Sequence, residues 1–145
     1  MENTTIETAI GREFVKKIIP LLDKARKSVF IIVYEWLWYP DQIGSTIQLF
    51  NNSIVRAKQR GLEVKAVVWN KKIGDMLNTI GIRAKWIGQS KLLHVKLMII
   101  DNEIVILGSH NYTKNAFDIN YEASVIINDQ KTAETFKQFF DGFFY

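Results

Sequence analysis

Short apolar segments rich in β-branched residues alternate along this chain with segments whose apolar residues recur at helical spacing. Residues 12–27 show the helical spacing, and residues 28–36 follow with an apolar run that is typical of a buried strand. A sheet that carries such strands has to be covered by helices on both of its faces. The pattern therefore predicts an α/β fold.

The expected elements account for most of the chain. Helices are predicted over residues 12–27, 40–61, 71–81 and 129–143, and strands over 28–36, 62–70, 83–88, 94–101, 103–109 and 121–127. The later strands follow one another without a helix of comparable length, which indicates a mixed sheet rather than an all-parallel one. The order of the strands cannot be read from this pattern.

Length and composition narrow the class of protein further. The chain has 145 residues, of which 48% are hydrophobic, and it shows no repeat or linker, so we expect one domain over residues 1–145. It has no cysteine, which excludes disulfides and thiolate zinc sites. The apolar runs are too short for a membrane span, and the first residues lack the pattern of a secretory signal. A cytoplasmic protein is the resulting expectation.

Positive charge is concentrated in the middle of the chain. Residues 56–96 hold ten Lys and Arg residues against Glu63 and Asp75, an excess of eight positive charges where the whole chain has a net charge of +4. Such a block favours a surface that attracts a polyanion, although solvated helix faces would explain the charge equally well. Lys71 and Lys72 are candidate contacts to a substrate backbone.

A pair of basic residues opens the apolar segment at residues 94–101. Side chains at positions i and i+2 of a strand share one face, so His94 and Lys96 are expected to project together. Burial of a lone Lys is unfavourable unless it meets an anion. The pair by itself is also compatible with a sheet edge where both side chains reach water.

The residues that follow this pair make a longer pattern. Four residues separate Lys96 from Asp101, and six more lead to Gly108-Ser109-x-Asn111. This spacing resembles the H-x-K-x4-D-x6-G-S-x-N signature of the phospholipase D superfamily, with every fixed position met. Glu122 is similar to an acidic residue that usually follows in these enzymes, and the resemblance extends from about residue 14 onward. It implies a phosphodiesterase that works through a covalent phosphohistidine.

The resemblance assigns a role to each residue. His94 would be the nucleophile, and Lys96 and Asn111 would stabilise charge on the nonbridging oxygens of the phosphate. Glu122 would accept a hydrogen bond from the other ring nitrogen of His94 and so hold its tautomer. Ser109 would orient His94 or donate to phosphate. Asp101 is a further candidate, although a purely local role in the turn beside Asn102 is as compatible with its position. These roles require no metal or other cofactor.

The motif occurs once, whereas the displacement of a leaving oxygen also requires a general acid opposite the nucleophile. Large members of the superfamily carry two motifs in one chain. We therefore expect a homodimer in which His94 of each subunit faces the same phosphate. His110, at the variable position of the Gly-Ser-x-Asn turn, is the alternative acid within one chain, at the rim of the site.

The sequence defines the class of phosphodiester substrate less closely than it defines the reacting residues. Small members with one motif are mostly nucleases, and the basic block fits the backbone of DNA or RNA. Trp36 and Trp38 follow a predicted strand and could stack on bases, pack into the dimer core, or insert into a lipid interface. An endonuclease is the favoured interpretation. A phosphodiesterase acting on membrane lipid and a non-catalytic nucleic-acid-binding subunit are the alternatives.

Overall fold

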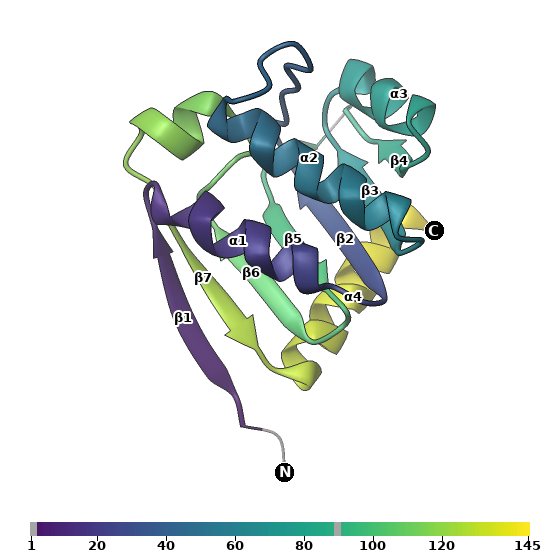
Figure 1. The fold of residues 1–145 in the computed structure, drawn as a ribbon. Helices are drawn as coiled ribbons and strands as arrows, with labels where there is room; N and C mark the ends of the chain where they lie inside the picture. The colour runs from purple at the N-terminus through teal and green to yellow at the C-terminus, as the bar shows by residue number, and fades with distance from the viewer. Residues whose placement is uncertain (1–2, 89–90) are drawn as a thin grey trace.

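A computed structural model describes residues 3–88 and 91–145, and it shows a seven-stranded mixed sheet with helices on both faces (Figure 1). The strand order is β1-β7-β6-β5-β2-β3-β4. Strands β2, β3 and β4 are parallel, and every other neighbouring pair is antiparallel. The strands are β1 (Thr5–Ile10), β2 (Ser28–Val33), β3 (Glu63–Val68), β4 (Arg83–Trp86), β5 (Lys96–Ile100), β6 (Ile104–Gly108) and β7 (Ala123–Asn128). The predicted fold class is confirmed.

Helices cover the two faces unequally. The helical elements are α1 (Glu13–Lys24), α2 (Thr46–Gln59), α3 (Lys71–Thr79), the π-helical turn η1 (Asn115–Ile119) and α4 (Gln130–Phe144). In Figure 1, α1 and α2 cross one face of the sheet and α4 lies behind the other. Val29, Ile31 and Val33 of β2 pack in the first layer, whereas Phe30 and Ile32 pack in the second. Because both of its faces are buried, β2 reads as a continuous apolar run.

Several element boundaries differ from the sequence-based prediction, and those of α2 and β5 bear on the site. Helix α2 begins at Thr46 rather than near residue 40, because the hydroxyl of Ser45 accepts a hydrogen bond from the backbone N–H of Gln48 and caps the helix there. Strand β5 begins at Lys96, so His94 precedes the strand. Its neighbour Val95 still accepts a hydrogen bond from the backbone N–H of Tyr34.

Strand β1 was not predicted. It lies at the edge of the sheet and pairs with β7 alone, and only Ala9 among its side chains is buried. A strand with so little burial shows no sustained apolar pattern in its sequence. Among the residues described, no helix is both long enough and apolar enough to cross a membrane.

The topology brings several chain segments to one edge of the sheet. Strands β2 and β3 end there, and antiparallel β5 begins there, with Lys96 opposite Val33. Strand β6 ends at the same edge, where Gly108 lies opposite Ser124 of β7. The segment after β6 therefore meets the segments after β2 and before β5.

Candidate active site

His94 and Lys96 lie side by side at this edge. The Lys96 Nζ atom is 3.1 Å from His94 Nδ1 and 3.2 Å from His94 Nε2, so the ammonium lies within hydrogen-bonding distance of both ring nitrogens. The ring of Tyr34, at the end of β2, lies 5.3 Å from the His94 ring, centroid to centroid. His94 is exposed, and a ring in this position is open to a substrate.

Burial affects the charge of Lys96. Partial desolvation lowers the pKa of the Lys96 ammonium, and the charges of Glu122 and Glu35 oppose that effect. The two carboxylates therefore lie close enough to stabilise the ammonium. A phosphate that reached this position would add a negative charge beside the same ammonium.

The turn after β6 fixes Glu122. Ser109 donates a hydrogen bond of 2.6 Å from its hydroxyl to Glu122 Oε1 and accepts one from the backbone N–H of Ala123 at 2.9 Å. Asn120 Nδ2 donates to Glu122 Oε2 at 3.1 Å. Both carboxylate oxygens of Glu122 are thus held by the chain.

Gly108 allows this turn to approach β7. A Cβ atom at position 108 would lie 2.2 Å from the hydroxyl oxygen of Ser124 and 2.4 Å from its Cα atom. No side chain fits between the two strands at that point. The glycine of the motif is therefore required by close packing.

Asn111 is oriented by the end of β2. Its Oδ1 atom accepts a hydrogen bond of 3.0 Å from the backbone N–H of Glu35, which leaves the amide nitrogen as the group available to donate. Asn111, Glu35 and Glu122 line one small pocket of about 290 Å³. The site thus combines an accessible imidazole, an ammonium, an amide donor and a positioned carboxylate, a set that can bind an anion and attack it.

Comparison with known proteins agrees with this geometry. Residues 18–144 match the family model described as "Cardiolipin synthase, PLD-like domain". The chain belongs to the phospholipase D-like family. This confirms the family membership that the resemblance of its motif implied.

Individual relatives within the phospholipase D-like family point to more than one activity. The chain is 27% identical over 133 residues to a phospholipase D of Rickettsia typhi, which covers 85% of this chain and 59% of the relative. It is 28% identical over 133 residues to a cardiolipin synthase of Staphylococcus aureus, covering 84% of this chain and 25% of that protein. The chain therefore spans well under two thirds of these curated relatives.

A solved structure matches over nearly its whole length. The phospholipase D family member Nuc from Salmonella typhimurium superposes with a TM-score of 0.82 at 26% identity, covering 97% of this chain and 94% of that one. The arrangement of strands and helices in Figure 1 is thus that of the phospholipase D-like fold.

His110 does not lie at the rim of the site, as the sequence-based interpretation had placed it. It is 1% exposed and stacks on Phe14 with a centroid distance of 4.3 Å. Its Nε2 atom is 2.9 Å from the carbonyl oxygen of Gly11, and its Nδ1 atom is 2.7 Å from the hydroxyl of Ser124. Because the carbonyl only accepts, Nε2 carries the proton and Nδ1 accepts from Ser124. His110 therefore contributes to packing rather than to substrate contact.

Asp101 lies at the opposite end of β5 from Lys96. Its carboxylate accepts hydrogen bonds from the backbone N–H groups of Arg26, Lys27 and Ser28, at 2.7 to 3.1 Å, where the chain enters β2. This position excludes direct contact with the reacting atoms. The local, structural alternative describes Asp101 correctly.

The two candidate tryptophans occupy different environments. Trp36 is 2% exposed, and its Nε1 atom donates a hydrogen bond of 2.7 Å to Asn51 Oδ1, so it packs in the core and does not stack on bases. Trp38 is half-buried and packs 5.6 Å from Trp36, centroid to centroid. The structure places Trp36 in the core of the single chain, whereas the packing alternative had placed it in the core of a dimer.

Several side chains of the basic block are engaged within the chain. Arg56 pairs with Asp23, Arg60 donates to backbone carbonyls, and Lys65 is buried against Tyr145 and Glu63. Lys71 pairs with Asp75 at 2.6 Å, whereas Lys72 lines a cleft between α3 and the segment after β2. Only part of the local charge excess is therefore available to a polyanion.

Several residues near the site were not singled out from the sequence. Tyr34 and Glu35 follow β2, Trp69 follows β3, and Lys114 lines the pocket that holds Asn111. The carboxyl ends of adjacent parallel strands meet at one edge of a sheet. The location of the residues directly after β2 and β3 could therefore have been predicted from the sequence. Lys114 had no such signal, because its place depends on η1.

Proposed function

We propose that this chain is a metal-independent phosphodiesterase that cleaves nucleic acid internally, with His94 as nucleophile. The observation that carries the proposal is the exposed His94 ring against the Lys96 ammonium, with Asn111 and Glu122 beside them. In a phosphodiester, this arrangement places an attacking nitrogen and two donors around one phosphorus atom.

The reaction follows from the positions of these groups. A neutral ring nitrogen of His94 attacks phosphorus, the P–N bond forms, and the P–O bond to the leaving group breaks. Lys96 and Asn111 donate to the nonbridging oxygens, whose charge rises as the transition state forms. Water then attacks the phosphohistidine from the side the leaving group occupied, which restores the imidazole and releases the phosphate end.

The leaving oxygen requires a proton that His94 of the same chain cannot deliver while it attacks. His110 is buried with both ring nitrogens engaged, so it is a poor source of that proton. A second copy of the chain, which would contribute its own His94, provides an acid of the right kind. Exposed apolar side chains next to site residues support a contact there, namely Leu92, Ile119 and Tyr121.

Nucleic acid is the substrate favoured by the resemblance to small single-motif nucleases and by the basic character of the chain, whose pI is about 9.3. A lipid phosphodiester is the second candidate, because curated relatives are named phospholipase D and cardiolipin synthase. Both candidates share the same chemical step.

The proposal is tested by incubating the protein with single-stranded DNA, duplex DNA, RNA and anionic phospholipid vesicles, each with excess chelator. We expect internal cleavage of nucleic acid that is unaffected by the chelator. Loss of all activity with chelator, restored by Mg²⁺, would contradict the histidine mechanism. Turnover of the vesicles alone would assign the site to lipid.

The shared site is tested with mixed dimers. Wild-type subunits are exchanged to equilibrium with His94→Ala subunits, and the cleavage rate is measured against the wild-type fraction. Because removal of a general acid costs ~10²–10⁴ in rate, a mixed dimer should be almost inactive, and activity should fall as the square of the wild-type fraction. A linear decline would show that each subunit acts alone.

A further inference from the structure

An aromatic cleft opens directly beside His94. It has a volume of about 660 Å³ and lies between the segment after β2 and helix α3. Twelve residues line it, among them Tyr34, Trp36, Trp38, Tyr39, Trp69 and Lys72. Five of these twelve side chains are aromatic rings, which gives the cleft flat apolar walls.

Tyr34 connects this cleft to the catalytic pair. Its ring centroid lies 5.3 Å from that of His94 and 6.2 Å from that of Trp69, and the Lys96 Nζ atom is 5.9 Å from the same ring. Tyr34 and Trp69 are both half-buried, so each still presents surface to the cleft. A ligand bound at His94 can therefore extend along the surface of these two rings.

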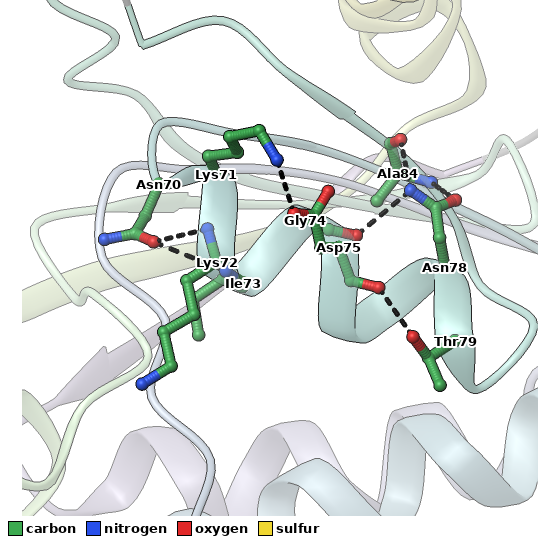
Figure 2. Close-up of polar contacts among 9 residues, drawn as sticks. All are labelled: Asn70, Lys71, Lys72, Ile73, Gly74, Asp75, Asn78, Thr79 and Ala84. Carbon is green, nitrogen blue, oxygen red and sulfur yellow. Dashed lines mark hydrogen bonds and ion pairs between the residues drawn. The ribbon is translucent and has the colours of Figure 1, made fainter.

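Polar groups border the cleft on the side of α3. Asn70 caps the helix through Oδ1, which accepts from the backbone N–H groups of Lys72 and Ile73, while its amide nitrogen points away from the helix (Figure 2). Lys71 turns to Asp75, whereas the Lys72 side chain extends in another direction (Figure 2). The cleft thus has a cation and an amide donor at its border.

We propose that this cleft binds an unpaired nucleobase next to the scissile phosphate. The inference rests on the proposed nuclease function. Bases of every type stack on aromatic side chains, so the cleft would favour single strands with little sequence preference. Every base in a strand has a phosphate on each side. A base stacked against the surface that Tyr34 and Trp69 present to the cleft would place one phosphate at His94 and leave the other to be met by Lys72.

An acyl chain fits this cleft less well. It would gain from apolar surface, yet Glu35, Asn70 and Lys72 place a carboxylate, an amide and an ammonium along the same walls. Those groups would lose hydration against hydrocarbon without gaining partners. A base offers polar edges to these groups and a flat face to the rings.

The test compares two single-stranded substrates, an oligothymidylate and a strand of the same length whose residues are all abasic. The wild-type protein and Trp69→Leu, Trp69→Phe and Trp86→Leu variants are assayed for kcat/KM, and folding is checked by thermal melting. Trp86 is a matched control because it lies on β4 and does not line the cleft. Charge reversal at Lys72 is compared with the same change at Lys71.

We expect Trp69→Leu to lose roughly tenfold in kcat/KM on oligothymidylate and almost nothing on the abasic strand, with Trp69→Phe close to wild type. Trp86→Leu should change neither value, and Lys72→Glu should weaken binding more than Lys71→Glu. Equal loss on both strands, or no loss on either, would overturn the nucleobase site while leaving the nuclease intact. Turnover of phospholipid with neither strand cleaved would overturn the nuclease proposal itself.

Discussion

The two histidines of the chain lie near the same edge of one sheet and have opposite environments. His94 is exposed, and both of its ring nitrogens lie near the ammonium of Lys96. His110 is 1% exposed, stacks on Phe14, and has both ring nitrogens engaged by Gly11 and Ser124. Residue type alone therefore does not identify the reactive imidazole, whereas access and free hydrogen-bonding capacity do.

The hydrogen bonds of His110 also suggest what a buried histidine does here. The backbone N–H of Gly11 donates to the carbonyl oxygen of Glu122 at 2.8 Å, while the Gly11 carbonyl accepts from His110. His110 thus ties the turn before α1 to the start of β7, next to Glu122. Its contribution is to position that segment.

The largest effect should separate the two histidines directly. His94→Ala removes the attacking atom, so kcat/KM on DNA should fall by ~10⁴ or more. His110→Gln keeps one donor and one acceptor and should change the rate by less than roughly tenfold. The measurement is steady-state cleavage with chelator present, and circular dichroism confirms that both variants fold. Equal inactivation of the two variants would show that His110 also takes part in the reaction.

A smaller effect is expected at Lys96, whose ammonium contacts the exposed histidine His94. Lys96→Met keeps the length of the side chain and removes its charge, so phosphate oxygens lose one donor in the transition state. We expect kcat to fall by ~10²–10³. Single-turnover rates at saturating substrate measure this step. An unchanged kcat with a raised KM would limit Lys96 to substrate binding.

The smallest effect concerns stability and involves only the buried histidine. Burial lowers the pKa of His110 from its usual 6.5, so the unfolded chain takes up a proton that the folded chain does not. The free energy of unfolding should therefore fall as the pH drops from about 6.5 toward the lowered pKa, and it should be fully retained above that window.

The His110→Gln variant lacks this proton uptake. Its Tm should decrease less between pH 7 and pH 5 than that of the wild type. The difference in Tm should be ~2–4 °C for each kcal/mol of unfolding free energy that the wild type loses over this range and the variant does not. His94→Gln is the matched control, because it makes the same replacement at the exposed histidine of the chain. A wild-type slope in His110→Gln would mean that other groups titrate in this range.

The sequence predicted the fold class well, because the apolar runs at β2, β3 and β5 are long and buried on both faces. It also identified the residues that gather at the site, since their spacing matches a family pattern. It did not reveal the positions of Asp101 and His110. Their separation from the substrate depends on strand direction and on packing beneath α1, which local spacing does not encode.

The aromatic cleft illustrates the same limit. Trp36 and Trp38 stood out in the sequence. The tryptophan that contacts Tyr34, the ring next to His94, is instead Trp69, which follows the neighbouring strand β3. Pairing of β2 with β3 brings Tyr34 and Trp69 together, and strand order was the part of the fold that the sequence left open.

The central claim is that His94 forms a covalent bond to phosphorus without a metal. The most direct measurement mixes the protein with a short DNA substrate in excess chelator, stops the reaction in alkaline denaturant, and locates adducts by peptide mass spectrometry. We expect a nucleotide-phosphate adduct on the peptide that contains His94, in amounts that rise and decay with turnover and are absent from His94→Ala. Cleavage that proceeds with no adduct at any time, or that requires Mg²⁺, would contradict the account.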